Sequence, residues 1–156
     1  MAEDRNAVER RIHHLINSYA WSIDQRDWTA FSSVFCERIA IDYESFSGMK
    51  PTTVVRDEYV PHVRDTISGF DVTQHQISNI LISGANGLFT AKAYLVAYHF
   101  LGMGAAREKY VLGGFYDLAF FEAGPELRIA SIRLTSNWTE GDFAIWRKAK
   151  KIWMTR

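Results

Sequence analysis

Residues 72–102 read VTQHQISNILISGANGLFTAKAYLVAYHFLG, and this stretch decides the fold. Two runs rich in β-branched and aromatic residues, 72–83 and 88–102, flank the turn-like sequence Gly84-Ala85-Asn86-Gly87. In a strand, side chains two residues apart share a face. The stretch therefore predicts two long strands joined by a tight turn.

Toward the C-terminus the same pattern continues. Residues 107–122 and 126–138 predict two more strands, after the turns Gly102-Met103-Gly104 and Glu122-Ala123-Gly124-Pro125. Long strands joined by tight turns form an antiparallel meander that must curl, and Gly113-Gly114 is expected to form a bulge or bend that assists the curling. Residues 142–156 mix aromatic and basic side chains, which predicts a terminal helix or arm docked by its rings.

Toward the N-terminus the period changes to that of helices. Apolar residues recur every three or four positions between residues 6 and 23, which predicts an amphipathic helix. A short helix capped by Asp27 is expected over 27–35, then a strand over 38–46. A third helix is expected over 54–68, with Thr52-Thr53 as caps and with a kink or an early finish at Pro61. Helices followed by strands predict an α+β domain in which N-terminal helices cover the concave face of a curved, mostly antiparallel sheet.

Length and composition limit the class of protein. A chain of 156 residues, 47% hydrophobic and 14% aromatic, predicts a single globular domain over 1–156 with a core large enough to enclose a pocket. Eighteen basic residues balance eighteen acidic ones, so neither nucleic acid nor an anionic membrane is an expected partner. The single cysteine, Cys36, excludes an intrachain disulfide framework. With no apolar run of membrane-spanning length and no signal-like N-terminus, the expected location is the cytoplasm.

Polar side chains on apolar faces are the candidate functional residues, because their burial is costly unless they are satisfied or used. On the strands, His75 is expected to share a face with Ile77 and Leu81, and His99 with residues 89, 91, 93, 95 and 97. Tyr43 and Asp117 lie among apolar residues by the same two-residue period. On the first helix, Tyr19 lies in the apolar stripe and Asp24 lies five residues later, at the helix end.

These residues suggest proton transfer, with plainer alternatives. If the first helix crosses the curved sheet, Asp24 can approach a strand histidine, fix its tautomer and leave the other ring nitrogen as a general base. Each histidine could instead be a satisfied core residue, and Asp117 could bond backbone amides at a bulge. The spacings HxH and HExxH of metal sites are absent, as are glycine-rich nucleotide-binding patterns, so no metal and no cofactor is expected.

Six segments in order resemble a known family. They are YAWSIDQRDWTAF (19–31), IDYESF (41–46), TQHQISN (73–79), VAYHF (96–100), GGFYD (113–117) and SIRLTSNW (131–138). The chain is similar over residues 8–146 to the SnoaL-like branch of the nuclear transport factor 2-like superfamily. The resemblance implies a cone-shaped α+β barrel with a deep apolar pocket.

The resemblance also implies roles for individual residues. Scytalone dehydratases in this superfamily use an Asp–His dyad, which matches Asp24 and His75, together with a carbonyl-polarising tyrosine that matches Tyr43 and a second histidine that matches His99. Bile acid 7α-dehydratase has a tyrosine where this chain has Tyr19. Ile23 replaces a second pocket tyrosine of the scytalone dehydratases, so scytalone itself is not the expected substrate. The expected substrate-contacting residues are Tyr19, Ile23, Phe115, Asp117 and Asn137.

The sequence thus predicts a cofactor-independent lyase, specifically a dehydratase, acting on a small apolar cyclic substrate. His75 would remove a proton α to a carbonyl, Tyr43 would stabilise the enolate, and His99 would bind or protonate the departing hydroxyl. An isomerase or cyclase with the same proton transfer, and a non-catalytic binding protein or partner subunit, are the alternatives. The apolar positions Tyr94, Val96, Tyr98 and Phe100, opposite the pocket-facing set, predict a homo-oligomer, either a trimer or a dimer.

Overall fold

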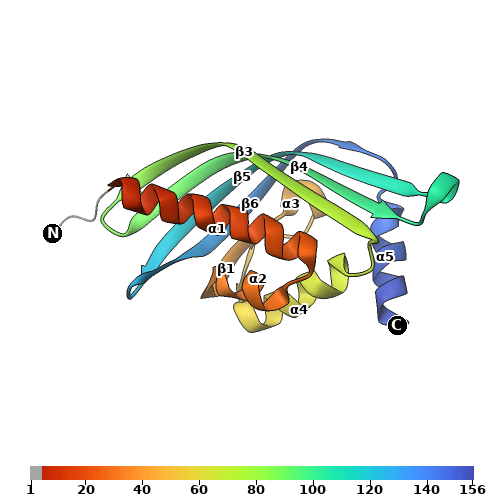
Figure 1. Ribbon diagram of the computed structural model, residues 1–156, viewed down its shortest axis with the longest axis horizontal. Coiled ribbons are helices and arrows are strands. Elements are labelled where there is room, and N and C mark those ends of the chain that lie inside the picture. The colour runs from red at the N-terminus through yellow and green to blue at the C-terminus, as the bar shows by residue number, and fades with distance from the viewer. Residues whose placement is uncertain (1–4) are drawn as a thin grey trace.

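The computed structural model describes residues 5–156 and confirms the α+β class. Its sheet has six strands in the order β2-β1-β6-β5-β4-β3 and arches over the helices α1, α2 and α4 (Figure 1). The strands are β1 (Phe35–Asp42), β2 (Thr52–Val55), β3 (Val72–Ala85), β4 (Leu88–Leu101), β5 (Glu108–Ala123) and β6 (Glu126–Glu140). The last four form the expected antiparallel meander, whereas β1 pairs with β6 in parallel.

Four helices begin and end close to the predicted positions, but the strand expected over 38–46 is β1, which ends at Asp42, and α3 follows it. The helices are α1 (Arg5–Gln25), α2 (Trp28–Ser33), α3 (Glu44–Ser47), α4 (Arg56–Ile67) and α5 (Ala144–Met154), with a 3₁₀ turn, η1 (Gly104–Ala106), between β4 and β5. Asp27 caps α2 as expected, since its side chain accepts a hydrogen bond from the Ala30 amide. The expected role of Thr52-Thr53 as helix caps is wrong, because these residues pair with β1 as a strand. The helix starts after that strand and continues through Pro61 rather than finishing early.

The strand register decides which side chains face inward. His99 and its neighbours on one face of β4, Ala97 and Leu95, are buried as predicted. Residues directly opposite in an antiparallel ladder share a face, and Tyr110 lies opposite His99. The inner face of β5 therefore carries Tyr110, Leu112, Tyr116, Leu118 and Phe120, all of which are buried.

Phe115 and Asp117 lie on the outer face of β5, so their expected position in the pocket is wrong. Asp117 lies opposite Lys92 in the ladder and forms an ion pair with it at 3.4 Å. The same lysine lies over the ring of Phe115, 4.8 Å from its centroid. Both faces of this strand are apolar in sequence, so periodicity alone could not choose between them, and the register with β4 makes the choice.

Bulges displace two other predicted residues. In β3 the pairing shifts between Ser78 and Leu81, where Asn79 has a positive φ of 54°, and Leu81 then points outward with 70% of its surface exposed. Leu81 therefore does not share the face of His75. In β6, Asn137 is the extra residue between the partners of Gly114 and Gly113, and it is exposed rather than in the pocket. A bulge shifts the alternation by one position, so a strict two-residue period fails beyond it.

The outer face of β4 carries the residues expected to drive self-association. Tyr94 is exposed there, and the rings of Tyr98 and Phe100 stack in parallel, 6.4 Å apart. The oligomeric state stays a prediction. Over residues 5–156, no helix combines the length and the apolar character needed to cross a membrane.

The C-terminal helix α5 packs against Gly69, a residue of the segment between α4 and β3. A Cβ atom placed on Gly69 would lie 1.8 Å from the carbonyl oxygen of Ala149, which is fully buried in α5. The backbone of α5 therefore approaches this position as closely as only glycine allows. The contact matters for the site because it fixes the helix that carries Trp146.

We expect Gly69→Ala to destabilise the fold by about 1–3 kcal/mol, because a backbone atom that cannot rotate away meets the new methyl group. Gly113→Ala is the matched control, since the atoms nearest to its added Cβ belong to the half-exposed indole of Trp138, which can move. Urea unfolding should show the larger loss for Gly69→Ala. Equal losses in the two variants would mean that α5 does not dock this closely.

Candidate active site

One cavity brings most of the predicted residues together. It has a volume of about 490 Å³ and lies between the inner face of the sheet and the helices α3, α4 and α5. Five predicted residues line it: Tyr19, Ile23, Tyr43, His75 and His99. The rest of the lining is largely apolar, with side chains such as Phe46, Leu95, Leu112 and Leu134. The cavity is suited to a ligand that is mostly apolar.

Asp24 lies behind His75 and holds its ring. The Nδ1 atom of His75 lies 2.7 Å from Oδ1 of Asp24, and the His75 backbone N–H donates to Oδ2, also at 2.7 Å. The hydroxyl of Thr73 donates to Oδ1 at 3.0 Å. Burial raises the pKa of Asp24, but these hydrogen bonds and the charge of His75 outweigh it and lower the pKa below its ordinary value. The ionised carboxylate therefore fixes the ring with its Nε2 atom directed away from Asp24.

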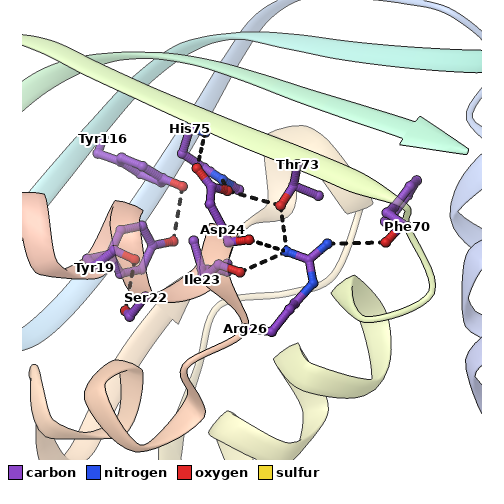
Figure 2. A network of polar contacts seen from close by, with 9 residues as sticks. All are labelled: Tyr19, Ser22, Ile23, Asp24, Arg26, Phe70, Thr73, His75 and Tyr116. Carbon is purple, nitrogen blue, oxygen red and sulfur yellow. Dashed lines mark hydrogen bonds and ion pairs between the residues drawn. The ribbon is translucent and has the colours of Figure 1, made fainter.

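Arg26 ties this dyad to the chain around it (Figure 2). Arg26 follows the end of α1 and has a left-handed backbone conformation, with a φ of 60°. The N–H of Asp27 donates to the carbonyl of Ser22, and the N–H of Arg26 donates to the carbonyl of Ile23. These two bonds form a Schellman motif, which ends the helix. The Arg26 guanidinium donates to the carbonyls of Ile23 and Asp24, at 2.8 and 3.2 Å, and to Thr73 Oγ1 at 2.7 Å. A second nitrogen donates to the carbonyl of Phe70 at 3.3 Å.

The arginine thus closes the end of α1 onto the start of β3, and the bridging hydroxyl of Thr73 links it to Asp24. Neither Arg26 nor Thr73 was predicted as a site residue. One sequence signal could have indicated Arg26. A helix commonly ends with a glycine in the left-handed conformation, and an arginine in that conformation costs about 1–2 kcal/mol more than glycine.

Four tyrosine hydroxyls gather at the cavity. Tyr19 and Tyr116 lie 3.2 Å apart through their hydroxyl oxygens, and so do Tyr43 and Tyr59. Burial raises the pKa of all four above the ordinary value, so all are protonated donors at neutral pH. Tyr59 and Tyr116 were not predicted as site residues, because a tyrosine among apolar residues in the sequence is typical of a hydrophobic core.

Tyr43 occupies the centre of this group. Burial raises the pKa of Tyr43, and hydrogen bonding opposes this effect; its hydroxyl oxygen lies 3.2 Å from that of Tyr59. When Tyr59 donates in this pair, Tyr43 retains its own proton for another partner. Tyr43 can therefore donate to an oxygen atom of a ligand in the cavity.

His99 is the second histidine of the cavity and is only 1% exposed. Burial, and then the nearby charge of His75, lower the pKa of His99 to about 3. The two imidazole rings lie 5.7 Å apart, and the indole of Trp146 lies 4.4 Å from the His99 ring. Of the two roles expected for His99, binding an oxygen fits a neutral ring and donating a proton as an acid does not.

Three of the predicted substrate contacts do not reach the cavity: Phe115, Asp117 and Asn137. In the part of the chain that the structure describes, no three side chains among His, Cys, Asp and Glu are placed to hold a metal ion together.

The low pKa of His99 makes stability depend on pH. Below the ordinary histidine pKa of about 6.5 the unfolded chain binds a proton at this position that the folded chain excludes, so stability falls as the pH falls toward 3. We expect a loss of about 2 kcal/mol between pH 7 and 4.5 from this residue. This prediction is tested by urea unfolding of the wild type and of His99→Phe at both pH values. If the free energy of unfolding falls equally in both proteins between these pH values, the prediction is wrong.

The chain is similar to known proteins over nearly its whole length. The SnoaL-like domain model matches residues 4–133. The Kfla4162 protein from Kribbella flavida superposes with a TM-score of 0.85 at 26% identity, covering 93% of this chain and 99% of that one. No curated protein sequence matches the chain.

Two similar structures carry the names of enzymes. A candidate scytalone dehydratase from Novosphingobium aromaticivorans has a TM-score of 0.74 at 20% identity, covering 88% of this chain and 89% of that one. A hexachlorocyclohexane dehydrochlorinase from Novosphingobium barchaimii has a TM-score of 0.72 at 10% identity, covering 89% and 92%. At these identities the likeness concerns the fold, which is that of the nuclear transport factor 2-like proteins. With a family model matched over most of its length and the predicted cone-shaped fold in place, the chain belongs to the SnoaL-like domain family.

Proposed function

We propose that the protein is a cofactor-independent hydro-lyase that removes water from a largely apolar cyclic ketone bearing a hydroxyl group β to the carbonyl. The observation that carries this proposal is the Asp24–His75 pair, joined at 2.7 Å, with the histidine lining a largely apolar cavity. A carboxylate on Nδ1 leaves Nε2 as the nitrogen that can accept a proton from a ligand. The names of the similar dehydratase and dehydrochlorinase structures agree with an elimination.

The reaction begins with abstraction of the proton α to the carbonyl. His75 Nε2 takes this proton, and the electrons of the C–H bond form an enolate whose oxygen accepts a hydrogen bond from Tyr43. The enolate then re-forms the carbonyl and expels the β-hydroxyl as the C–O bond breaks. The proton held by His75 passes to the departing oxygen, so that water leaves and the dyad returns to its starting state.

Elimination is favoured over isomerisation because the cavity offers a second position for an oxygen. His99 lies beside His75, with the ring centroids 5.7 Å apart, on the inner face of β4. A hydroxyl held there would lie within reach of the proton on His75. An isomerase or a cyclase would begin with the same abstraction, and analysis of the products separates the three.

Exchange of the α proton tests the first step directly. In D₂O the wild type should exchange the C2 protons of 1-tetralone, and His75→Ala should slow this exchange by roughly 10²–10⁴-fold because a positioned base is lost. Asp24→Asn should slow it less, since the aspartate only orients the ring. The rate is measured by proton NMR or mass spectrometry.

The matched controls are His13→Ala and Asp57→Asn, which alter an exposed histidine on α1 and an exposed aspartate on α4. Both should exchange at the wild-type rate. A wild-type protein that binds tetralone tightly yet never exchanges its α protons would contradict the proposal and favour the carrier alternative.

The tyrosines provide a second test. Tyr43→Phe should lower the exchange rate by roughly 10²–10³-fold, the usual cost of losing an oxyanion donor. Tyr59→Phe removes only a hydrogen bond to Tyr43, so it should cost roughly 2- to 13-fold. Tyr94→Phe, on the exposed outer face of β4, is the control and should change nothing. The reverse order of the first two would assign the oxyanion contact to Tyr59.

A further inference from the structure

Arg26 adopts a backbone conformation that is unusual for its residue type. It follows α1 with a φ of 60°, in the left-handed region where a Cβ atom is strained and glycine is not. Glycine is the residue that most often ends a helix in this way. Strained residues of this kind cluster at functional sites, so the Arg26 side chain is a candidate for a role beyond ending the helix.

One contact of this side chain is not needed to end a helix. The bonds from Arg26 to the carbonyls of Ile23 and Asp24 cap α1, at 2.8 and 3.2 Å. A shorter bond, at 2.7 Å, runs to the hydroxyl of Thr73 on β3. Thr73 is buried and lies two residues before His75 on the same strand. The contact therefore joins Arg26 to the strand that carries the base of the dyad.

The chemistry of the groups fixes the direction of each hydrogen bond between Arg26 and His75 (Figure 2). A guanidinium has donors and no acceptor, so the Thr73 oxygen accepts from Arg26. The single hydroxyl proton of Thr73 donates to Asp24 Oδ1 at 3.0 Å. The same oxygen accepts from His75 Nδ1, and Oδ2 accepts from the His75 backbone N–H, both at 2.7 Å. Three donors thus converge on the Asp24 carboxylate.

The bond from Thr73 bears on which member of the dyad holds the proton. Burial raises the pKa of Asp24, whereas the hydrogen bonds from His75 and from Thr73 lower it. A carboxylate that accepts several hydrogen bonds is a weaker base. In the proposed abstraction His75 becomes a cation, and Asp24 stabilises that cation only while it stays ionised and does not take the Nδ1 proton.

We propose that Arg26 is a positioning residue of the Asp24–His75 dyad and that it acts through Thr73. The guanidinium occupies the acceptor side of the Thr73 hydroxyl, which holds the hydroxyl proton on Asp24 and keeps the carboxylate as the acceptor of the dyad. Neither Arg26 nor Thr73 lines the cavity. The order of hydrogen bonds needs no substrate, and the inference rests on the proposed function only for its effect on the reaction.

Other titratable groups respond to Asp24 or lie on elements packed against α1. Burial lowers the pKa of His99 and raises that of Tyr116, and the charge of Asp24 raises both to a lesser extent. The α2 segment WTAFSS carries no charged residue, and on β6 Arg128 and Arg133 pair with other carboxylates. None of these residues is altered in the variants below, so a change at Asp24 reports on the contact that each variant removes.

Two variants separate the proposed role from the ending of the helix. Arg26→Gly supplies the residue that best suits the left-handed conformation but removes the guanidinium, and Thr73→Val removes the hydroxyl. The Asp24 carboxyl signal is identified in ¹³C NMR as the one that Asp24→Asn removes. In both variants it should titrate at a higher pH than in the wild type, because a donor to the carboxylate is lost or released. Thr73→Ser keeps the hydroxyl and should titrate as the wild type does.

The His75 amide reports whether the junction between α1 and β3 stays closed. It donates to Asp24 Oδ2, so it should remain slow to exchange with D₂O in both variants. The matched controls are Asn86→Gly, which changes another left-handed residue, in the turn between β3 and β4, and Thr90→Val, which changes an exposed threonine of β4. Both controls should leave the titration of Asp24 unchanged.

A double variant tests whether Arg26 acts through Thr73. If it does, Arg26→Gly combined with Thr73→Val should raise the pKa of Asp24 no further than Thr73→Val alone. Additive increases would assign the effect to the charge of Arg26 and overturn the role of Thr73. An unchanged titration in either single variant would overturn the proposal. A His75 amide that exchanges rapidly would do so as well, because the contact would then be only a structural link.

The effect on the reaction is measured separately, with 1-tetralone. Thr73→Val should slow exchange of the α protons by roughly 2- to 13-fold through kcat with KM unchanged, because the carboxylate loses one of the bonds that fix it while the ligand keeps its contacts. A wild type that never exchanges contradicts the lyase, and the titrations then decide the positioning role alone. A wild type that exchanges, with variants that titrate at the wild-type pH, keeps the lyase and overturns this inference.

Discussion

The carboxylate of Asp24 joins the C-terminal end of α1 to the first residues of β3, and the cavity depends on this junction. Both carboxylate oxygens accept hydrogen bonds from β3, one from the backbone of His75 and the other from its ring and from Thr73. Arg26 closes the same junction from the other side by binding carbonyls of α1 and the chain before β3. A helix end held in this way fixes where the sheet can arch over the helix, and it places the histidine at the cavity wall.

The junction also explains why an ionised carboxylate can lie beside a largely apolar cavity. An isolated buried carboxylate is costly, but one that accepts several hydrogen bonds stays ionised. Arg26 supplies a positive charge behind the pair, toward the loops, while several polar groups that line the cavity are neutral: the tyrosine hydroxyls, His99 and the indole of Trp146. The cavity is therefore not free of charge, since Lys50 and Glu58 also line it, but these neutral groups give a ligand uncharged hydrogen-bond partners.

Much of this architecture could be predicted from the sequence, and the failures have physical causes. The helix of 6–23, the meander and the convergence of Asp24 with His75 follow from periodicity, turn residues and the family resemblance. The faces of β5 could not be assigned, because both are apolar and only the register with β4 distinguishes them. Asn137 was misplaced because the irregularity expected at Gly113-Gly114 places its extra residue in the partner strand β6.

The missed residues of the site share one property: each is of a type that usually has a structural role. Tyr59, Tyr116 and Trp146 are large rings in apolar stripes, and their polar atoms become informative only when their partners are known. Two hydroxyls are paired at 3.2 Å, whereas the indole nitrogen of Trp146 has no partner among the described residues. That contrast cannot be read from a sequence, because it depends on where α5 docks.

Docking of α5 at Gly69 therefore has a consequence beyond stability. The helix approaches the chain before β3 so closely that any side chain at position 69 would collide with the backbone of Ala149. Phe70, the next residue, contacts both His99 and Trp146 and offers its carbonyl to Arg26. One short segment, Gly69-Phe70, thus sets the position of the helix that closes the cavity and of the arginine that supports the dyad. Under the proposed reaction, the base and the site of the departing hydroxyl would be positioned by this shared segment, which accounts for their proximity although α1 and α5 lie at opposite ends of the chain.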